Sequence, residues 1–192
     1  MTSDCTGKIV IFSAPSGSGK TTVVNHLVKE FPQLEFSISA TSRTPRGDER
    51  NGHEYYFFSD GEFKEMADRG EFIEWEEVYA GTSYGTLKSE VERIWAKGNI
   101  IVFDVDAKGG ISLKEIFGDC ALSVFVMPPS VDELRRRLLK RGTDSDETIE
   151  RRLAKAAQEI GHAPSFDMIL VNDHLPYALA EAERIIGDFI AR

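Results

Sequence analysis

Residues 8–22, KIVIFSAPSGSGKTT, decide the fold, because a short apolar run there leads into a glycine-rich loop that ends in Lys20 and Thr21. Gly17 and Gly19 allow the backbone to curl so that successive N–H groups point inward, as the binding of phosphate oxygens requires. The apolar stripe that follows predicts a helix, whose positive N-terminus adds to the attraction for anions. A strand, a loop of this composition and a helix together predict a P-loop that binds a nucleoside triphosphate.

The residue types of the loop match the chemistry of a bound triphosphate. Lys20 brings a positive charge to the β- and γ-phosphates, and the hydroxyl of Thr21 is placed to bind Mg²⁺ directly. Ala14 stands where the usual pattern begins with glycine, and its methyl group is tolerable if φ there is negative. GTPases, ATPases and kinases share such loops, so the loop alone does not name the phosphate acceptor. The predicted triphosphate site comprises Ala14, Pro15, Ser16, Gly17, Ser18, Gly19, Lys20, Thr21 and Thr22.

Strand-like runs and helical stripes alternate along the rest of the chain. The runs are short and rich in Ile, Val and Phe, and none alternates strictly with polar residues, which predicts a parallel sheet buried on both faces. They are Lys8–Ser13, Asn99–Val105, Ala121–Met127 and Asp167–Asn172. Apolar residues at helical spacing predict helices around Val23–Val28, Val131–Leu138, Ile149–Ile160 and Leu179–Phe189, with Ser130 and Glu133 as a capping box for the second. We therefore expect an α/β fold, a three-layer P-loop core around a central parallel sheet.

Two stretches break this alternation. The first stretch, Glu35–Gly85, is rich in aromatic residues, glycine and charge. Its predicted strands, Glu54–Phe58 and Glu71–Tyr79, look antiparallel in character. The second, Arg141–Glu147, is a polar break between two helices, as expected for a mobile lid. We predict a single unit over residues 1–192, with a core of 1–34, 87–140 and 156–192, an insert of 35–86 and a helical lid of about 141–155.

Composition narrows the class of protein. The chain has 192 residues, 41% of them hydrophobic and 29% charged, which is typical of a folded domain. Its net charge of −9 argues against a protein whose role is bulk contact with nucleic acid. Cys5 and Cys120 are expected to be unpaired thiols in a reducing cytosol. No signal peptide and no run long enough to span a bilayer is recognisable, so a cytoplasmic location and no membrane partner are expected.

The phosphate acceptor has to be identified from the insert. Ser39–Arg46, SATSRTPR, places two arginines three residues apart around Pro45, and guanidinium forks suit phosphate oxygens. Tyr55 and Tyr84 offer hydroxyl donors nearby. These four side chains could hold a monophosphate, and a solvated surface loop is the alternative for the arginines.

The combined motifs closely resemble guanylate kinase. They are the P-loop, the Ser39–Phe57 pattern S-x-T-S-R-T-P-R-x-x-E-x-x-G-x-x-Y-x-F, FIEW at Phe72–Trp75, YGT at Tyr84–Thr86 and FDVD at Phe103–Asp106. The resemblance runs from Lys8 to about Asp173. It implies transfer of the terminal phosphoryl group of ATP to GMP, and to dGMP, giving ADP and GDP with Mg²⁺ as cofactor in purine nucleotide metabolism.

The resemblance also implies roles for residues of the insert. Arg43, Arg46, Tyr55 and Tyr84 would hold the GMP phosphate, Glu49 would steady the arginine-bearing loop, and Ser39, Glu74, Thr86 and Asp106 would surround the guanine base. A carboxylate such as Glu74 can accept from guanine N1–H and N2–H₂ together, and a hydroxyl such as that of Ser39 or Thr86 can donate to O6. Adenine would leave buried polar groups unpaired, which permits strong discrimination. The alternative for Glu74 is an edge-strand carboxylate in an acidic run.

On the triphosphate side, Asp104 ends an apolar strand, where ligands bind in open α/β sheets. We assign it to organising Mg²⁺ through water, with a helix cap as the alternative. By the resemblance, Arg141 and Arg152 would reach the ATP phosphates on closure, and Asn172 would lie on the adenine side. The predicted catalytic set is therefore Lys20, Arg43, Arg141 and Arg152, while Arg135, Arg136, Arg137 and Arg151 are expected on solvated helix faces.

Two other functions remain open from the sequence. One is a non-catalytic guanylate-kinase-like binding module, and the other is a P-loop kinase of a different phosphorylated acceptor. Intact Lys20, Thr21 and Arg43 favour an enzyme, and the predicted base-facing set favours guanine. ATP and GMP are the expected partners, nucleic acid is not, and the oligomeric state is open.

Overall fold

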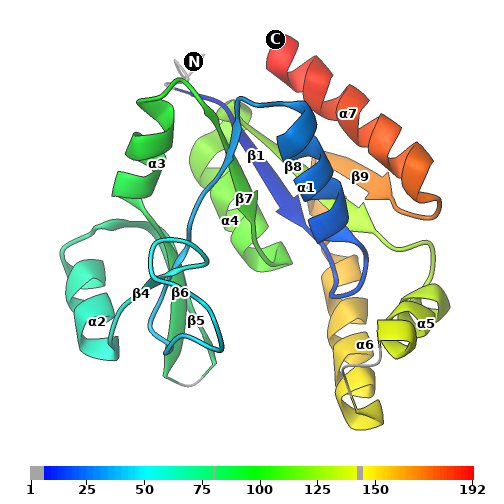
Figure 1. Ribbon diagram of the computed structural model, residues 1–192, viewed down its shortest axis with the longest axis horizontal. Helices are drawn as coiled ribbons and strands as arrows, with labels where there is room; N and C mark the ends of the chain where they lie inside the picture. Colours follow the sequence, from blue (N-terminus) through cyan, green and yellow to red (C-terminus); the bar gives the residue numbers. More distant parts are fainter. Residues whose placement is uncertain (1–6, 80, 142–144) are drawn as a thin grey trace.

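The computed structural model describes residues 7–79, 81–141 and 145–192. Its core is a five-stranded parallel sheet with the strand order β2-β7-β1-β8-β9, which confirms the predicted sheet (Figure 1). Four of these strands match the predicted apolar runs, and β2 is an additional short strand. The strands are β1 (Ile9–Ser13), β2 (Leu34–Phe36), β7 (Ile100–Asp104), β8 (Ala121–Met127) and β9 (Met168–Val171).

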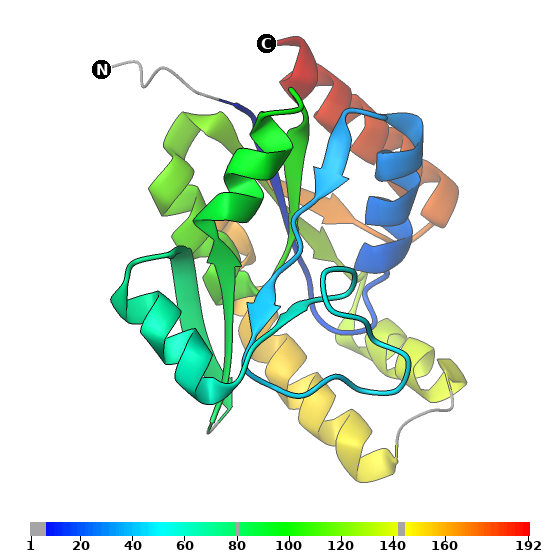
Figure 2. The ribbon, with the colours of Figure 1, turned by 60° about the vertical axis from the view of Figure 1, so that its left-hand side comes forward.

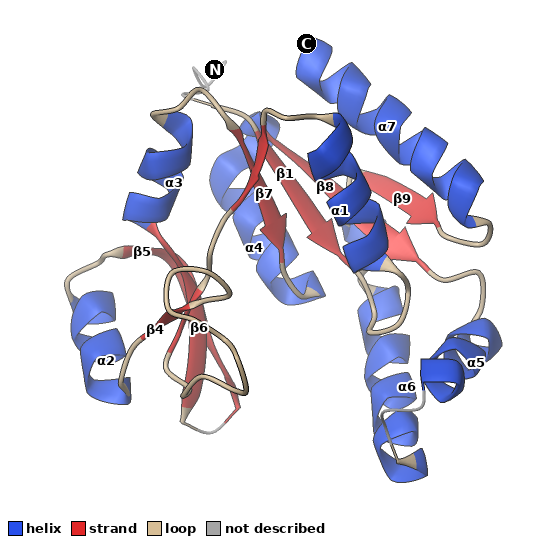
Figure 3. Ribbon diagram, viewed as in Figure 1, coloured by secondary structure: helices blue, strands red, loops and turns tan. Residues whose placement is uncertain are grey.

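Helices cover both faces of this sheet, so the core has three layers (Figures 1 and 3). One face carries α1 and α7, whose apolar residues pack on Val10 and Phe12. The other carries α3 and α4, which pack on Ile9 and Ile11. Because β1 is buried on both sides, it has no room for the polar alternation of a half-exposed strand. The helices are α1 (Lys20–Glu30), α3 (Lys88–Trp95), α4 (Ala107–Phe117) and α7 (Leu175–Ala191).

A second sheet, with the order β4-β3-β6-β5, forms the insert. The antiparallel prediction is confirmed for β5, which pairs with β6, but it is wrong for β4, which pairs with β3 in parallel. The strand β3, which was not predicted, pairs with β6 in antiparallel fashion. The helix α2 packs on this sheet through Phe63, whose ring stacks on Phe72 with centroids 4.5 Å apart. The elements are β3 (Ala40–Thr41), β4 (Tyr56–Phe57), α2 (Asp60–Asp68), β5 (Phe72–Tyr79) and β6 (Thr82–Leu87).

The core extends slightly further than predicted. Glu35 and Phe36 belong to β2, which pairs with β7 in the central sheet, so the predicted start of the insert at residue 35 is two residues too early. The strand was missed because it has only three residues, too few for a pattern in the sequence to be read.

Two helices, α5 (Val131–Arg141) and α6 (Asp146–Gly161), lie around the predicted lid of about 141–155, which takes in the end of α5 and the first part of α6. They enclose a small apolar cluster of their own: Leu134, Leu138, Ile149, Leu153 and Ala156. Ser130 Oγ accepts from the backbone N–H of Glu133 at 3.0 Å, as a capping box requires. The Glu133 carboxylate, however, accepts from Arg137 Nε at 2.8 Å.

The elements converge at one end of the core. Figures 1 and 2 show the insert and the α5–α6 pair flanking the carboxyl ends of the central strands. In a parallel sheet this end collects the loops that follow every strand, which makes it the usual ligand site.

Cys120 corrects one prediction from the sequence. It was expected to be an unpaired thiol, and it is disulfide-bonded in the structure. Cys5 lies outside the described residues. Among the helices of the described part of the chain, none has the length and apolar character needed to cross a membrane.

A close helix–sheet contact gives a stability prediction. A Cβ at Gly110 in α4 would come within 2.6 Å of Ser13 Oγ and 3.1 Å of the Phe166 ring. Alanine normally favours a helix over glycine by about 1 kcal/mol, but overpacking of this kind costs about 1–3 kcal/mol. We therefore expect Gly110→Ala to lower the midpoint of thermal unfolding by several degrees.

Gly61→Ala is the matched control for this prediction. Gly61 also lies in a helix, α2, and a Cβ there would meet nothing within 4 Å. We expect this variant to unfold at the wild-type temperature or slightly above it. A Gly110→Ala protein as stable as Gly61→Ala would contradict the close packing of α4 on β1.

Candidate active site

The loop after β1 has the conformation that its glycines predict. Gly17 and Gly19 have φ values of 93° and 92°, in the left-handed region that favours glycine. The Ser18 N–H donates to Pro15 O at 3.1 Å and closes the turn, and Gly19 is the N-cap of α1. No non-glycine residue of the described chain has a positive φ, so Ala14 meets the condition for its tolerance at the first position.

Asn172, which follows β9, is hydrogen-bonded to this loop. Its side chain, 5% exposed, donates from Nδ2 to Ser18 O at 2.7 Å. Arg137 in turn donates to Asn172 O at 2.9 Å and to Ser18 O at 3.4 Å. Asn172 therefore supports the loop through Nδ2, and its place on the adenine side stays a prediction. The prediction of a solvated face for Arg137 is wrong, because its guanidinium is bonded to the backbone of Ser18 and Asn172.

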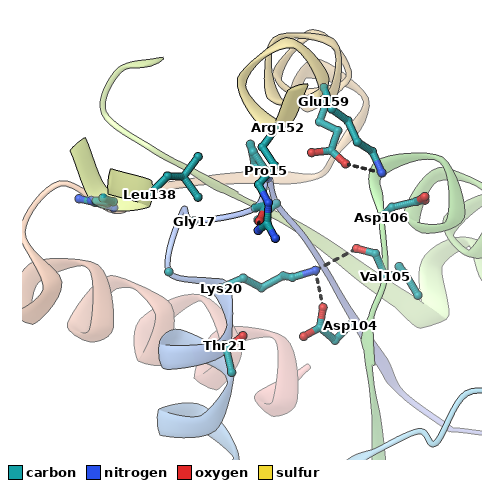
Figure 4. Close-up of a pocket in the computed structure, with 15 residues that line it drawn as sticks. Pro15, Gly17, Lys20, Thr21, Asp104, Val105, Asp106, Leu138, Arg152 and Glu159 are labelled. Carbon is teal, nitrogen blue, oxygen red and sulfur yellow. Dashed lines mark hydrogen bonds and ion pairs between the residues drawn. The ribbon is translucent and has the colours of Figure 1, made fainter. Parts of the chain in front are cut away.

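A cavity of about 550 Å³ opens above the loop (Figure 4). It is lined by the loop itself, by the end of β7 and by residues of α5 and α6. Arg152 reaches across from α6, and its Nη1 donates to Ser16 Oγ at 2.8 Å. Arg141 is the last residue of α5, and its side chain lies outside the described part of the structure. The sequence did not single out Lys155 and Glu159, which also line the cavity and share a helix face with Arg152.

Lys20 is held at the end of β7. Its Nζ forms an ion pair with the Asp104 carboxylate and donates to Val105 O at 3.1 Å (Figure 4). The register of β1 with β7, in which Phe12 pairs with Asp104, brings the two groups together. Asp106, not Asp104, is the cap of α4, because its carboxylate accepts from Gly109 N at 2.9 Å.

The oxygen ligands at this place fit Mg²⁺. The Thr21 hydroxyl and the Asp104 carboxylate line the same cavity, and both are the hard oxygen donors that Mg²⁺ prefers. In kinases the ion is held by one or two protein oxygens together with substrate phosphates. No cluster of three or more His, Cys, Asp or Glu side chains that could hold a metal occurs among the described residues, which is consistent with this shared mode.

Arg43 is the centre of a second cluster, on the insert. Its Nη1 and Nη2 donate to the two carboxylate oxygens of Glu49 at 2.6 and 2.9 Å, and its Nε donates to Tyr84 Oη at 3.1 Å. The guanidinium also lies over the ring of Tyr55, 5.0 Å from its centroid. Glu49 accepts a further bond from the backbone N–H of Arg46 at 2.8 Å, so this carboxylate ties the arginine-bearing loop together.

These bonds shift the protonation equilibria of the cluster. Hydrogen bonds from Arg43, and then from the Arg46 backbone, lower the pKa of Glu49 to about 2. Pairing with Glu49 raises the pKa of Arg43 above its already high value. Since both fork nitrogens of Arg43 already contact Glu49, a phosphate would have to use its remaining N–H or displace the carboxylate. The Arg46 side chain is exposed.

A smaller cavity, of about 160 Å³, lies between the insert and the core. Ser39, Tyr55, Glu74 and Tyr84 line it from the insert, and Asp104 and Asp106 from the core. Burial raises the pKa of Glu74, and the nearby Asp106 adds to the rise. The structure therefore brings most of the predicted acceptor-side residues to one cavity.

Thr86 lies beside Glu74. It is 1% exposed, and its hydroxyl donates to Glu74 Oε1 at 2.7 Å. An ionised carboxylate only accepts hydrogen bonds, so in this structure the single hydroxyl hydrogen of Thr86 is used to orient the Glu74 carboxylate. The signal was available in the sequence, since a short insert with β5 and β6 paired would place these two residues opposite each other. A contact of Thr86 with the guanine base stays a prediction.

Comparison with known proteins agrees with this geometry. The family model described as guanylate kinase matches residues 6–188. A guanylate kinase of Bacteroides fragilis is 52% identical over 183 residues, covering 95% of this chain and 90% of its own. A guanylate kinase of Porphyromonas gingivalis is 53% identical over 186 residues, covering 96% of this chain and 99% of its own.

Solved structures show the same relationship. The crystal structure of guanylate kinase from Anaplasma phagocytophilum superposes with a TM-score of 0.72 at 33% identity, covering 96% of this chain and 85% of its own. A shikimate kinase from Bacteroides thetaiotaomicron, at a TM-score of 0.51 and 15% identity, shares the fold alone. With its P-loop, its arginine-bearing insert and these matches over nearly the whole length, this chain belongs to the guanylate kinase family.

Proposed function

We propose that this protein transfers the γ-phosphoryl group of ATP to the phosphate of GMP, and also to that of dGMP, giving ADP and the nucleoside diphosphate. The observation that carries the proposal is the pair of cavities that meet at Asp104. One is built on the P-loop, and the other on Glu74 and on Tyr55 and Tyr84, which contact Arg43, so two nucleotides would point their phosphates at each other. A cytoplasmic setting, where both nucleotides occur, fits this reaction.

The P-loop would bind and orient the donor. Its inward N–H groups and the N-terminus of α1 hold phosphate oxygens, and Lys20 supplies the charge at the β- and γ-phosphates. Lys20 is at present paired with Asp104, so it would exchange one anionic partner for another. Thr21, as a direct ligand, and Asp104, through water, would hold Mg²⁺, which would supply neutralisation of the charge that develops on the phosphates.

The lid would complete the site from above. Arg152 already points into the donor cavity toward Ser16 (Figure 4). A guanidinium at the transferring group stabilises the negative charge on its equatorial oxygens, and Arg141 would add a second one. Closure also excludes water, which would otherwise compete with GMP for the phosphoryl group.

The insert would bind the acceptor. Arg43, Arg46, Tyr55 and Tyr84 would hold its phosphate, with Glu49 fixing the position of Arg43. Glu74, oriented by Thr86, would accept from N1–H and N2–H₂ of guanine, with Asp106 on the opposite wall. No side-chain base is needed, because the attacking phosphate is already anionic, so catalysis consists of alignment and charge neutralisation.

A panel of acceptors tests the proposed function. ADP formation would be measured in a coupled assay with ATP, Mg²⁺ and each of GMP, dGMP, AMP, CMP and UMP. We expect turnover with GMP and dGMP and at least about a hundredfold lower kcat/KM with the others, because they leave buried groups of the base cavity unpaired. No turnover with GMP, despite measurable GMP binding, would favour a non-catalytic module.

Lys20→Ala separates chemistry from acceptor binding. Because Lys20 lies on the P-loop and does not line the acceptor cavity, we expect loss of kcat by about a thousandfold or more with the dissociation constant for GMP nearly unchanged. Calorimetry measures the dissociation constant for GMP, and single-turnover kinetics measure the rate of phosphoryl transfer. Equal loss of both would mean that Lys20 supports the fold.

Glu74→Gln tests base recognition. A carboxamide presents one acceptor and one donor, so it opposes one of the two guanine donors, and kcat/KM for GMP should fall about 10–100-fold with little change for AMP. Glu71→Gln is the control, since Glu71 accepts from Arg69 at the surface of the same region. An unchanged ratio of GMP to AMP turnover would remove Glu74 from the base site.

The same carboxylate predicts a pH dependence. Burial raises the pKa of Glu74, so this group gains a proton earlier than an ordinary glutamate as the pH falls. KM for GMP should rise on the acidic side in the wild type, and this rise should be absent in Glu74→Gln.

A further inference from the structure

A buried carboxylate joins the insert to the core at the point where the chain passes between them. The chain leaves the core at residues 37–39, between β2 and β3, and returns at Leu87, between β6 and α3 (Figure 2). Glu90 lies in the first turn of α3, beside the return, and is only 2% exposed.

Four donors converge on this carboxylate. Oε1 accepts from the backbone N–H of Ile38 at 2.9 Å and from Arg93 Nη2 at 2.8 Å. Oε2 accepts from Tyr56 Oη at 3.1 Å and from Arg93 Nε at 2.8 Å. Ile38 belongs to the outgoing crossing and Tyr56 to β4 of the insert, while Glu90 and Arg93 belong to the core helix.

Arg93 extends the connection to the central sheet. Its Nη1 donates to Glu35 Oε1 at 2.6 Å, and Glu35 lies on β2. Glu35 also accepts from Lys97 at 2.7 Å and from Asn99 at 2.6 Å. Although burial opposes it, the bonds from Arg93, Ile38 and Tyr56 hold the pKa of Glu90 below its usual value, so the group stays ionised. A buried charge with this many partners is a rigid joint, because each lost donor leaves part of the carboxylate unsatisfied.

We propose that Glu90 is a positioning residue for the acceptor nucleotide: it fixes the insert against the core so that the base cavity is assembled before GMP arrives. The inference rests on the proposed function. Its basis is that the base cavity has one wall on the insert, with Glu74, and the other on the core, with Asp106, so its shape depends on the angle between the two parts. The donor cavity takes its lining from the core and the lid, so it does not depend on that angle.

The proposal predicts an effect on one substrate only. If the bond network holds the insert in the binding-competent arrangement, its loss lowers the fraction of competent molecules, and the apparent affinity for GMP falls by the same factor. The residue does not touch the nucleotide in this scheme, and its effect passes through Ile38 and Tyr56.

The test uses Glu90→Gln in the full-length protein, with KM for GMP and for ATP and the GMP dissociation constant from calorimetry. A carboxamide is nearly isosteric, but its NH₂ group faces donors and cannot accept from them. We expect about a tenfold rise in KM and dissociation constant for GMP, with KM for ATP within about twofold of the wild type. Glu92→Gln, at an exposed position of the same helix, should leave all three constants unchanged.

A merely structural role gives a different result. It would lower the unfolding temperature and the active fraction, and hence the maximal rate, without a selective change in GMP affinity. If Glu90→Gln folds and its GMP constants are within twofold of the wild type, or if KM for ATP rises equally, the proposal is overturned.

Tyr56→Phe covers the case in which Glu90→Gln does not fold. It removes only the Tyr56 bond to Oε2 and leaves the Ile38 and Arg93 bonds in place. We expect about a threefold rise in the GMP dissociation constant, and no change would overturn the proposal. If the wild type binds GMP but forms no GDP, the proposed function fails. The proposal for Glu90 is still tested in that case, because calorimetry reports the effect of Glu90 on GMP binding. A wild type that does not bind GMP at all would overturn both.

Discussion

The parallel pairing of β1 with β7 is the constraint on which the site depends. Its register sets Phe12 opposite Asp104, so the loop that starts at Ala14 opens beside the carboxyl end of β7. Lys20, the first residue of the helix after that loop, then reaches Asp104 and Val105. The donor cavity, the proposed magnesium ligands and the inner wall of the acceptor cavity all follow from this one alignment, and the insert and the predicted lid are attached around it.

Three cations of the site already have acidic partners before any nucleotide binds. Lys20 pairs with Asp104, Arg43 with Glu49 and Arg137 with Glu133. In a chain of net charge −9 these pairs allow a basic pocket to exist without unpaired buried charge. Binding of phosphate then becomes an exchange of anionic partners, and discrimination comes from geometry more than from bulk attraction.

Local features of the sequence predicted most of the architecture. The P-loop could be read because its backbone curl needs glycine at Gly17 and Gly19, and the strands could be read because burial on both faces removes polar alternation. The strand β2 and the parallel pairing of β4 could not be predicted from the sequence. Each pairing involves only two or three residues, and the partner strand is set by the fold and not by a local pattern. The same holds for Asn172 and Arg137, whose hydrogen bonds join segments that only the fold brings together.

Two carboxylates of the insert show why residue type alone does not fix a role. Glu49 accepts from Arg43 and from the Arg46 backbone, and these bonds lower its pKa to about 2. Glu74 is buried, with Asp106 as a like-charged neighbour, and its pKa is raised. As the pH falls, Glu74 therefore gains its proton well before Glu49 does. The cluster proposed to hold the phosphate then stays intact under conditions in which the carboxylate proposed to bind the base has lost its charge. If these roles hold, affinity for the phosphate and selectivity for the base are separable properties of one insert.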